Sequence, residues 1–372
     1  MKPFIAKIIS FPIPHKKTRR QFRQWLENLD FATPLRIIKI VCVRRHNTIF
    51  LIEANPFHAE CMYSVFKHFT ENNQNVIILT TKQNIEKNLF PKNVKLYCIQ
   101  PFDLRILDFI HFFNTAKSVF VNSYFIWKTQ STANKYFVNY IKKDKTLIAI
   151  DHAPNFYDYT LPVPENVYRF VLSDFMSKKY GYPVFYTFDF PASVNINVQN
   201  RKFISVGVIG DNLRRDMDSY LNILDTKPEM FSYIISSFIF PNYKIRLQNL
   251  KNIQVYEQAS FSQLFECCRA ATFIPFLIHD ESLDLYKDRI TGNINLVLGF
   301  GLIPIIDKKL ATLYNITDDT GILYSGRKEL NDAIERALHM PHDKIQQMRK
   351  NILKMAQNLR AKNADTMNAI IR

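Results

Sequence analysis

A short stretch of this 372-residue chain combines the residue types that bind phosphate. Thr291, Gly292 and Asn293 stand directly before an apolar stretch with helical spacing, within the segment 286–306. The free N–H groups and positive dipole of a helix N-terminus attract a diphosphate, and glycine permits its close approach. Arg289, one turn earlier, adds a charge-assisted contact to the leaving phosphate. The segment is a candidate phosphate site, although a capped helix without a ligand also explains it.

A second set of ionisable residues follows two apolar runs in the first half of the chain. Asp151 and His152 come directly after the run 147–150, and Glu53 and His58 follow the run 48–52. Ligands bind at the carboxyl ends of parallel strands, and transfer of a group to a hydroxyl needs a base there. We expect Asp151 or His152 to be the catalytic base, with Glu53 and His58 in reserve. Each histidine alone could equally cap or satisfy a turn.

Further candidates for nucleotide binding surround the phosphate segment. Gly210 lies in a turn that follows the apolar run 203–209, where Arg214 or Arg215 could assist in binding phosphate and where a tight turn without a ligand is an equal explanation. Glu281 belongs to an acidic run that could bind ribose hydroxyls or could be a solvated loop. Tyr286, which opens the phosphate segment, completes the set. We expect neither a metal nor another cofactor.

The elements that must position these residues alternate along the chain. Apolar runs without polar alternation, separated by stretches with helical spacing, indicate strands buried on both faces of a parallel sheet. In the first half these runs are 48–54, 76–81, 94–100, 118–124, 147–151 and 168–173, with helical spacing at 57–72 and 129–142. In the second half they are 203–209, 231–239, 253–257, 271–276, 302–306 and 321–325. The pattern predicts an α/β protein with two doubly wound units.

The predicted division of the chain has four parts. Residues 1–45 form a basic amphipathic extension, and 46–190 form a first Rossmann-like domain. Residues 200–340 form a second such domain, and 341–372 contain a long helix, predicted at 342–362, near the domain junction. None of the eight glycines precedes residue 181 and seven follow residue 200. Because close backbone approach to phosphate favours glycine, the nucleotide is expected on the second domain.

Several segments resemble GT-B glycosyltransferases of bacterial surface-glycan (lipopolysaccharide or capsule) biosynthesis. They are 286–306, which is similar to the donor-binding element of that family, 320–324 with 329–330, and 172–179. The resemblance implies two facing Rossmann-like domains and metal-independent transfer of a hexose from a nucleotide-diphosphate donor to a membrane-associated glycan or lipid-linked acceptor. The family's retaining members often carry Glu in the helix where this chain has Asn293 and Asn295, so the stereochemical outcome stays open.

Charge is concentrated at the two ends of the chain. Of a formal net charge of +16, residues 1–45 carry +9 (eleven Lys and Arg, two Asp and Glu) and residues 340–372 carry +5 (seven and two), leaving +2 for the body. Phe22, Trp25, Leu26 and Leu29 form one apolar stripe beside this N-terminal charge. The pattern favours docking on an anionic membrane surface over nucleic-acid binding, although an ordinary surface helix explains the stripe equally well.

Five cysteines without C-X-X-C spacing indicate a reducing compartment. We therefore expect a cytoplasmic protein at the inner face of the cell membrane. Alternatives on the same fold are a glycerophosphate or polyol-phosphate transferase and a nucleotide-sugar epimerase. A basic nucleic-acid-binding protein is the alternative from another class.

Overall fold

The structure is a computed structural model. It describes residues 32–43, 45–55, 58–123, 146–154, 167–192, 200–210 and 214–370, together with Arg19 and Val194. The helix predicted through Phe22, Trp25, Leu26 and Leu29 lies outside the described residues, as does the helical stretch predicted at 129–142.

The first half of the chain forms a six-stranded parallel sheet with the order β3-β2-β1-β4-β5-β6. Its strands are β1 (Thr48–Glu53), β2 (Asn75–Thr80), β3 (Lys95–Cys98), β4 (Ser118–Val121), β5 (Thr146–Ile150) and β6 (Val167–Phe170). All six overlap the apolar runs predicted to be strands. The central strand β1 is buried along its whole length, as expected for a strand covered on both faces.

Helices cover both faces of this first sheet. They are α3 (Thr33–Val41), α4 (Ala59–Glu71), α5 (Lys82–Glu86), α6 (Pro101–Phe109), the 3₁₀ turn η1 (Phe112–Thr115) and α8 (Asp174–Tyr180). Alternate residues of β1 separate the two faces: Phe50 and Ile52 pack with α3, α6 and η1, whereas Ile49 and Leu51 pack with α4 and α8. This alternation follows from the two-residue period of a strand.

The second half repeats the topology in a separate six-stranded parallel sheet with the order β12-β11-β10-β7-β8-β9. Its strands are β7 (Phe203–Val206), β8 (Ser232–Ser236), β9 (Ile253–Glu257), β10 (Phe273–Pro275), β11 (Ile303–Asp307) and β12 (Ile322–Tyr324). When the strands of each sheet are numbered in chain order and listed from one edge to the other, both sheets have the Rossmann strand order 3-2-1-4-5-6. The predicted α/β fold class with two doubly wound sheets is confirmed.

The helices of the second half follow its strands in alternation. They are α9 (Met217–Thr226), α10 (Pro241–Asn249), α11 (Phe261–Ala270), η2 (Asp280–Lys287), α12 (Gly292–Phe300), α13 (Lys308–Tyr314), η3 (Arg327–Glu329), α14 (Leu330–Leu338) and α15 (His342–Ile370). Among these helices, α12 lies almost completely in the interior, since eight of its nine residues are buried. A helix that is apolar all round belongs in the interior, which explains its position between the sheet and α15.

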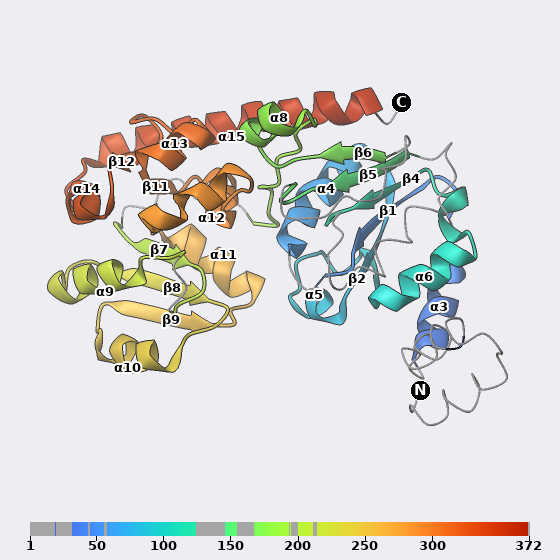
Figure 1. The fold of residues 1–372 in the computed structure, drawn as a ribbon, viewed down its shortest axis with the longest axis horizontal. Helices are drawn as coiled ribbons and strands as arrows, with labels where there is room; N and C mark the ends of the chain where they lie inside the picture. Colours follow the sequence, from blue (N-terminus) through green and yellow to red (C-terminus); the bar gives the residue numbers. More distant parts are fainter. Residues whose placement is uncertain are drawn as a thin grey trace.

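The last helix, α15, runs along both halves of the molecule (Figure 1). Its first part contributes Ile345, Met348 and Ile352 to the core of the second half, whereas Met367 packs in the core of the first half. The Asn363 side chain accepts a hydrogen bond from Tyr186 N at 2.8 Å and donates one to Tyr186 O at 2.8 Å. This amide therefore fastens α15 to the crossing segment that joins the two sheets.

Candidate functional site

The two sheets bring their site residues to the edge at which the strands end, here called the carboxyl edge. In a sheet of order 3-2-1-4-5-6, neighbouring loops diverge between the first and fourth strands, and ligands bind in that crevice. In the first sheet this point lies between β1 and β4, and in the second between β7 and β10. Glu53 ends β1 and the turn with Gly210 follows β7, whereas Asp151 and His152 follow β5 at the same edge of the first sheet.

At the first carboxyl edge, Glu53 is buried and its carboxylate is fully engaged. It accepts hydrogen bonds from Asn55 N (2.9 Å), Asn55 Nδ2 (3.0 Å), Asn122 Nδ2 (2.7 Å) and Ser123 Oγ (2.5 Å). Burial raises the pKa of Glu53, and these hydrogen bonds, foremost those from Ser123 and Asn122, oppose the rise. A carboxylate with four donors has no oxygen left for substrate, so Glu53 ties the end of β1 to the end of β4.

His58 and His152 meet over this network. Their rings stack with centroids 4.2 Å apart and an angle of 25° between the planes. His152 Nε2 lies 2.8 Å from Asn122 O, and a ring N–H must be the donor to that carbonyl. Burial lowers the pKa of His152 to about 3, with the nearby His58 charge adding to the effect. His152 is therefore a neutral, buried support for the more exposed His58.

His58 combines exposure with an acidic neighbour. Its side chain is 43% exposed, and its Nδ1 lies 3.8 Å from Glu60 Oε1. Burial lowers the pKa of His58, but the adjacent carboxylate of Glu60 and the charge of Glu53 outweigh burial and leave the pKa raised. Its backbone, at φ 63°, is left-handed, which is uncommon for a residue other than glycine and is found at functional sites.

Asp151 has a different environment. It is fully buried, and its carboxylate forms an ion pair with Arg169 NH2 at 2.5 Å and accepts Ala153 N at 3.2 Å. Arg169 in turn donates to the Tyr182 hydroxyl at 2.6 Å and stacks over that ring. The pair joins β5 to β6, the strand beside it, and a buried pair of this kind is costly to break.

At the second carboxyl edge, α12 begins as predicted with Thr291 as its N-cap. The Thr291 side chain accepts a long hydrogen bond from Asn293 N (3.4 Å), and Thr291 N donates to the Tyr314 hydroxyl at 2.9 Å. A Cβ built on Gly292 would meet no atom within 4 Å. Asn293 is 2% exposed, yet its Nδ2 has no hydrogen-bond partner among the described residues. The helix N-terminus thus presents open space and a buried N–H donor.

Gly210 and Arg214, predicted beside this site, have other surroundings. A Cβ on Gly210 would come within 1.9 Å of the Phe240 ring, so the absence of a side chain is explained by packing alone. Arg214 is exposed. The neighbouring Arg215 lies at the switch point: its NH1 donates to Phe276 O at 2.7 Å and its Nε would touch a Cβ on Gly207.

Arg215 is the best placed cation of the second edge. Burial lowers its pKa, and Tyr286 and Tyr314 lie close enough to affect it. The chain beside it is strained, since Leu277 has φ 49° immediately after the residue that Arg215 contacts. A cation held at this point can meet a diphosphate that approaches α12.

The remaining predicted donor residues are distributed around this edge. Tyr286 is buried, and Arg289 Nε donates to Leu285 O at 3.2 Å within its own loop. Glu281 is 83% exposed. It borders a polar cavity of about 50 Å³ that is also lined by Asp216, Asp280, Tyr324 and Arg327, in which Arg327 pairs with Asp216 at 2.8 Å.

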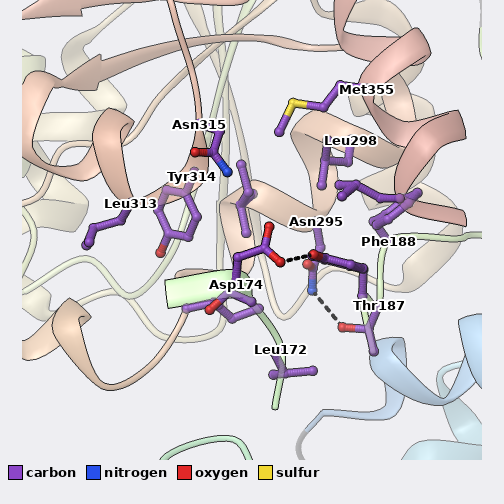
Figure 2. Close-up of a pocket in the computed structure, with 15 residues that line it drawn as sticks. Leu172, Asp174, Thr187, Phe188, Asn295, Leu298, Leu313, Tyr314, Asn315 and Met355 are labelled. Atoms are coloured by element: carbon purple, nitrogen blue, oxygen red, sulfur yellow. Dashed lines mark hydrogen bonds between the residues drawn. The ribbon is translucent and has the colours of Figure 1, made fainter. Parts of the chain in front are cut away.

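The two edges are connected through the segment that crosses between the sheets. Thr187 Oγ1 lies 3.4 Å from Cys61 Sγ on the first turn of α4 and 3.4 Å from Asn295 Nδ2 on the first turn of α12. Figure 2 shows the Asn295 bond together with the bond from Tyr186 to Asp174 (2.6 Å). The first turns of α4 and α12 therefore both contact Thr187, which connects the two domains at this point.

Cavities lined by described residues of both domains include the following two. The one drawn in Figure 2 has a volume of about 40 Å³, which admits a few waters and not a nucleotide sugar. The other, of about 240 Å³, lies between the loop 88–91 and α11, and no predicted site residue lines it. A further interdomain contact joins Asp288, just before Arg289, to Lys179 and Tyr180 of α8.

Among the described residues, no three His, Cys, Asp or Glu side chains are grouped to hold a metal ion. No helix among them is long and apolar enough to cross a membrane.

Sequence reasoning missed two residues of the first edge. Asn122 follows β4 and links Glu53 to His58 and His152, and its Oδ1 has no hydrogen-bond partner among the described residues. Glu60 stands two residues after His58 and accounts for its raised pKa. Asn122 lies inside the predicted run 118–124, where its polar side chain among apolar ones was the signal that the strand ends, whereas Glu60 carried no signal of its own.

Comparison with solved structures identifies the fold. A glycosyltransferase from Rickettsia africae matches with a TM-score of 0.59 at 11% identity, over 89% of this chain and 100% of that one. AviGT4, a glycosyltransferase of avilamycin A biosynthesis, gives 0.53 at 10% identity, over 85% and 96% of the two chains. HepE from Anabaena, solved with UDP and glucose, gives 0.53 at 11%, over 87% and 99%.

These likenesses, with the two Rossmann-ordered sheets, show that the chain has the GT-B fold of glycosyltransferases, as the sequence resemblance implied. No protein-family model matches the sequence. No curated protein matches it.

Proposed function

We propose that the protein is a glycosyltransferase that moves a hexose from a nucleotide-diphosphate donor to a hydroxyl of a membrane-associated glycan or lipid-linked acceptor, without a metal. The observation that carries the proposal is the N-terminus of α12, where open space at Gly292 adjoins the buried Nδ2 of Asn293, which no described residue bonds. The GT-B fold supports it, and one neighbour with this fold, HepE, is described in complex with UDP and glucose.

The donor's diphosphate would lie against the N-terminus of α12. The helix dipole, its first N–H groups and Asn293 Nδ2 would meet the charge on one side, and Arg215 on the other. Gly292 permits the approach because a side chain there would occupy the space in front of the helix. The polar cavity near Glu281 and Asp280 would take the ribose hydroxyls.

His58 is the base that the geometry favours. Asp151 is committed to Arg169, Glu53 to four donors, and His152 is buried and neutral, whereas His58 is exposed and next to Glu60. Neutral His58 would take the acceptor hydroxyl proton as the oxygen bonds to the anomeric carbon. The bond from that carbon to the diphosphate breaks, and the electron pair leaves with the diphosphate. Asn122 Oδ1, which has no hydrogen-bond partner among the described residues, would accept a second sugar hydroxyl.

The biological setting completes the proposal. The basic N-terminal stretch fits an anionic membrane surface, so the acceptor would belong to lipopolysaccharide or capsule assembly at the inner face of the cell membrane. No nucleic acid is expected as a partner.

Thermal unfolding with UDP, GDP, CMP and a single-stranded oligonucleotide tests the donor assignment. A bound nucleotide raises stability by RT ln(1 + [L]/Kd), and one of the three should do so while the oligonucleotide does not. Arg215→Gln should raise the apparent Kd of the nucleotide about tenfold and thereby reduce the nucleotide-induced thermal shift. The matched change Arg214→Gln should leave both unchanged. Stabilisation by the oligonucleotide alone would refute the proposal. An equal response of both arginine variants would place the phosphate elsewhere.

A further inference from the structure

One face of the first domain exposes large apolar side chains on two neighbouring helices, α3 and the end of α6. Leu35 and Ile38 of α3 are 63% and 58% exposed, and Phe109 and Ile110 at the end of α6 are 72% and 45% exposed. We call these four residues the α3/α6 patch. Both helices lie on the side of the first sheet away from the second domain (Figure 1). The outward face of a helix on a monomeric protein is normally polar, so the patch needs a partner.

The helices are themselves firmly held. Ile40 of α3 packs in the core with Leu104 and Leu107 of α6, and Arg36 binds Asp103 through two hydrogen bonds of 2.7 and 3.1 Å. Leu35 and Ile38 therefore point outward from a fixed helix, rather than belonging to a helix that could turn to bury them.

The charge of α3 selects the partner, since α6 itself carries Arg105 against Asp103 and Asp108, and its Asp103 is paired with Arg36. Helix α3 contains Arg36 and Lys39 and no acidic residue, and Lys39 is exposed beside Ile38. The chain that precedes α3 is basic as well: residues 1–32 hold seven Lys and Arg against two Asp and Glu. Apolar side chains beside concentrated positive charge fit the interface of an anionic bilayer, where both contribute to binding.

The position of α3 also suits an acceptor that is held in a membrane. Arg36 binds Asp103 in the first turn of α6, and α6 follows β3 directly after its carboxyl end. The basic stretch thus joins the fold at the carboxyl edge of the first sheet, the edge that carries His58 and Asn122. A membrane at this face would keep a lipid-linked acceptor near that edge and leave the second domain free to bind the donor.

We propose that the α3/α6 patch docks the protein on an anionic membrane, with Leu35, Ile38 and Phe109 entering the interface. This inference deepens the proposed function, since it names the surface through which the acceptor-binding domain meets its membrane. The other possible occupants, a second copy of the chain or the N-terminal segment 1–31, are distinguished by the test.

The test is flotation of the full-length protein with vesicles of phosphatidylcholine mixed with phosphatidylglycerol, and with pure phosphatidylcholine vesicles. The wild type should bind the anionic vesicles and lose affinity as salt is raised. Leu35→Glu with Ile38→Glu should weaken binding about tenfold or more. The matched control is Ile245→Glu, which changes a 68% exposed isoleucine on α10 of the second domain and should leave vesicle binding unchanged.

Several outcomes would overturn the proposal. They are absence of wild-type binding to anionic vesicles, equal binding by the double variant, and an equal loss in Ile245→Glu. A double variant that converts a dimer to a monomer with unchanged vesicle binding would assign the patch to a second copy. Tighter vesicle binding after deletion of residues 1–31 would assign it to that segment.

Nucleotide binding and turnover of a water-soluble acceptor, measured on the same samples, should be unaffected by the double variant. If the wild type neither binds a nucleotide nor transfers a sugar to the soluble acceptor, the proposed function is refuted. The vesicle result would then still test the docking surface by itself.

Discussion

The two carboxyl edges have the same strand order but present different chemical groups to a ligand. The first edge is built from side chains: Glu53, Asn122, His152 and the pair of Asp151 with Arg169 satisfy one another and leave His58 exposed. The second edge is built from backbone: α12 begins in open space at Gly292, and Arg215 is the charged group at its switch point. A diphosphate needs many N–H groups at close range, which side chains supply less well than a helix N-terminus.

Each edge also carries a buried amide with an atom that bonds to none of the residues in the described ranges, and the two atoms have opposite character. Asn122 presents a carbonyl oxygen, which accepts a hydrogen bond, and Asn293 presents an NH₂ group, which donates one. An acceptor sugar offers hydroxyl protons, whereas a diphosphate offers only oxygens. The difference between the amides therefore agrees with an acceptor on the first domain and a donor on the second.

The largest expected effect comes from removing the exposed base of the first edge. His58→Ala should lower turnover about 10²–10⁴-fold and leave the donor affinity unchanged, because proton transfer is lost while α12 is intact. His152→Ala should cost less, since it removes only the stacked support. Turnover and donor Kd are measured separately, with the exposed His46→Ala as the matched control. If His58→Ala keeps near-normal turnover, another residue of this edge is the catalytic base.

Asp151→Asn should act on stability rather than on chemistry. The change leaves Arg169 buried without its charged partner, and breaking a buried pair costs about 3–5 kcal/mol. Denaturant unfolding measures the loss, and Asp284→Asn, which breaks an exposed pair with Lys287, should have little effect. If Asp151→Asn folds with wild-type stability and loses turnover, Asp151 is the base after all.

The fold could be predicted from the sequence because buried parallel strands leave runs such as 49–52 and 76–79 that are apolar at successive positions. The helix start at Thr291 was equally local, since an N-cap is a residue type at a position. The environment of Asp151 was not local. Its pair with Arg169 depends on the register that places Ala149 opposite Arg169, and no spacing in the sequence encodes that register. Gly210 likewise faces Phe240 only after folding.

Gly292→Val tests the backbone chemistry of the second edge. The side chain would enter the open space before α12, so nucleotide affinity should fall about tenfold or more, or about 1.4 kcal/mol. The free energy of unfolding should change little, because a Cβ there meets no atom within 4 Å. Calorimetric titration and denaturant unfolding separate these two effects.

Gly210→Ala is the control for that variant. The Cβ would collide with Phe240, so stability should fall by about 1–3 kcal/mol, with nucleotide affinity retained in the folded fraction. If Gly292→Val binds nucleotide as the wild type does, the phosphate does not approach α12 at this residue.

Glu60→Gln sharpens the comparison through pH. Glu60 contributes to the raised pKa of His58, and a base must be unprotonated to act, so activity in the wild type should fall as pH drops through that raised pKa. Loss of the Glu60 charge lowers the pKa of His58, and the acidic limb of kcat/KM against pH should move to lower pH. Glu71→Gln, at the far end of α4, should not move it. If the acidic limb of the profile does not move in Glu60→Gln, Glu60 does not control the pKa of the catalytic base.

The smallest expected effect concerns Glu281, whose side chain is 83% exposed at the rim of the polar cavity. Glu281→Ala should change nucleotide affinity by about twofold at most, because a solvated carboxylate exchanges a ribose hydroxyl for water with little net gain. The measurement is calorimetric titration with the nucleotide that stabilises the wild type. A tenfold loss would show that this side chain closes over the ribose when the donor binds. The second edge would then use a side chain as well as backbone, and the contrast with the first edge would be one of degree.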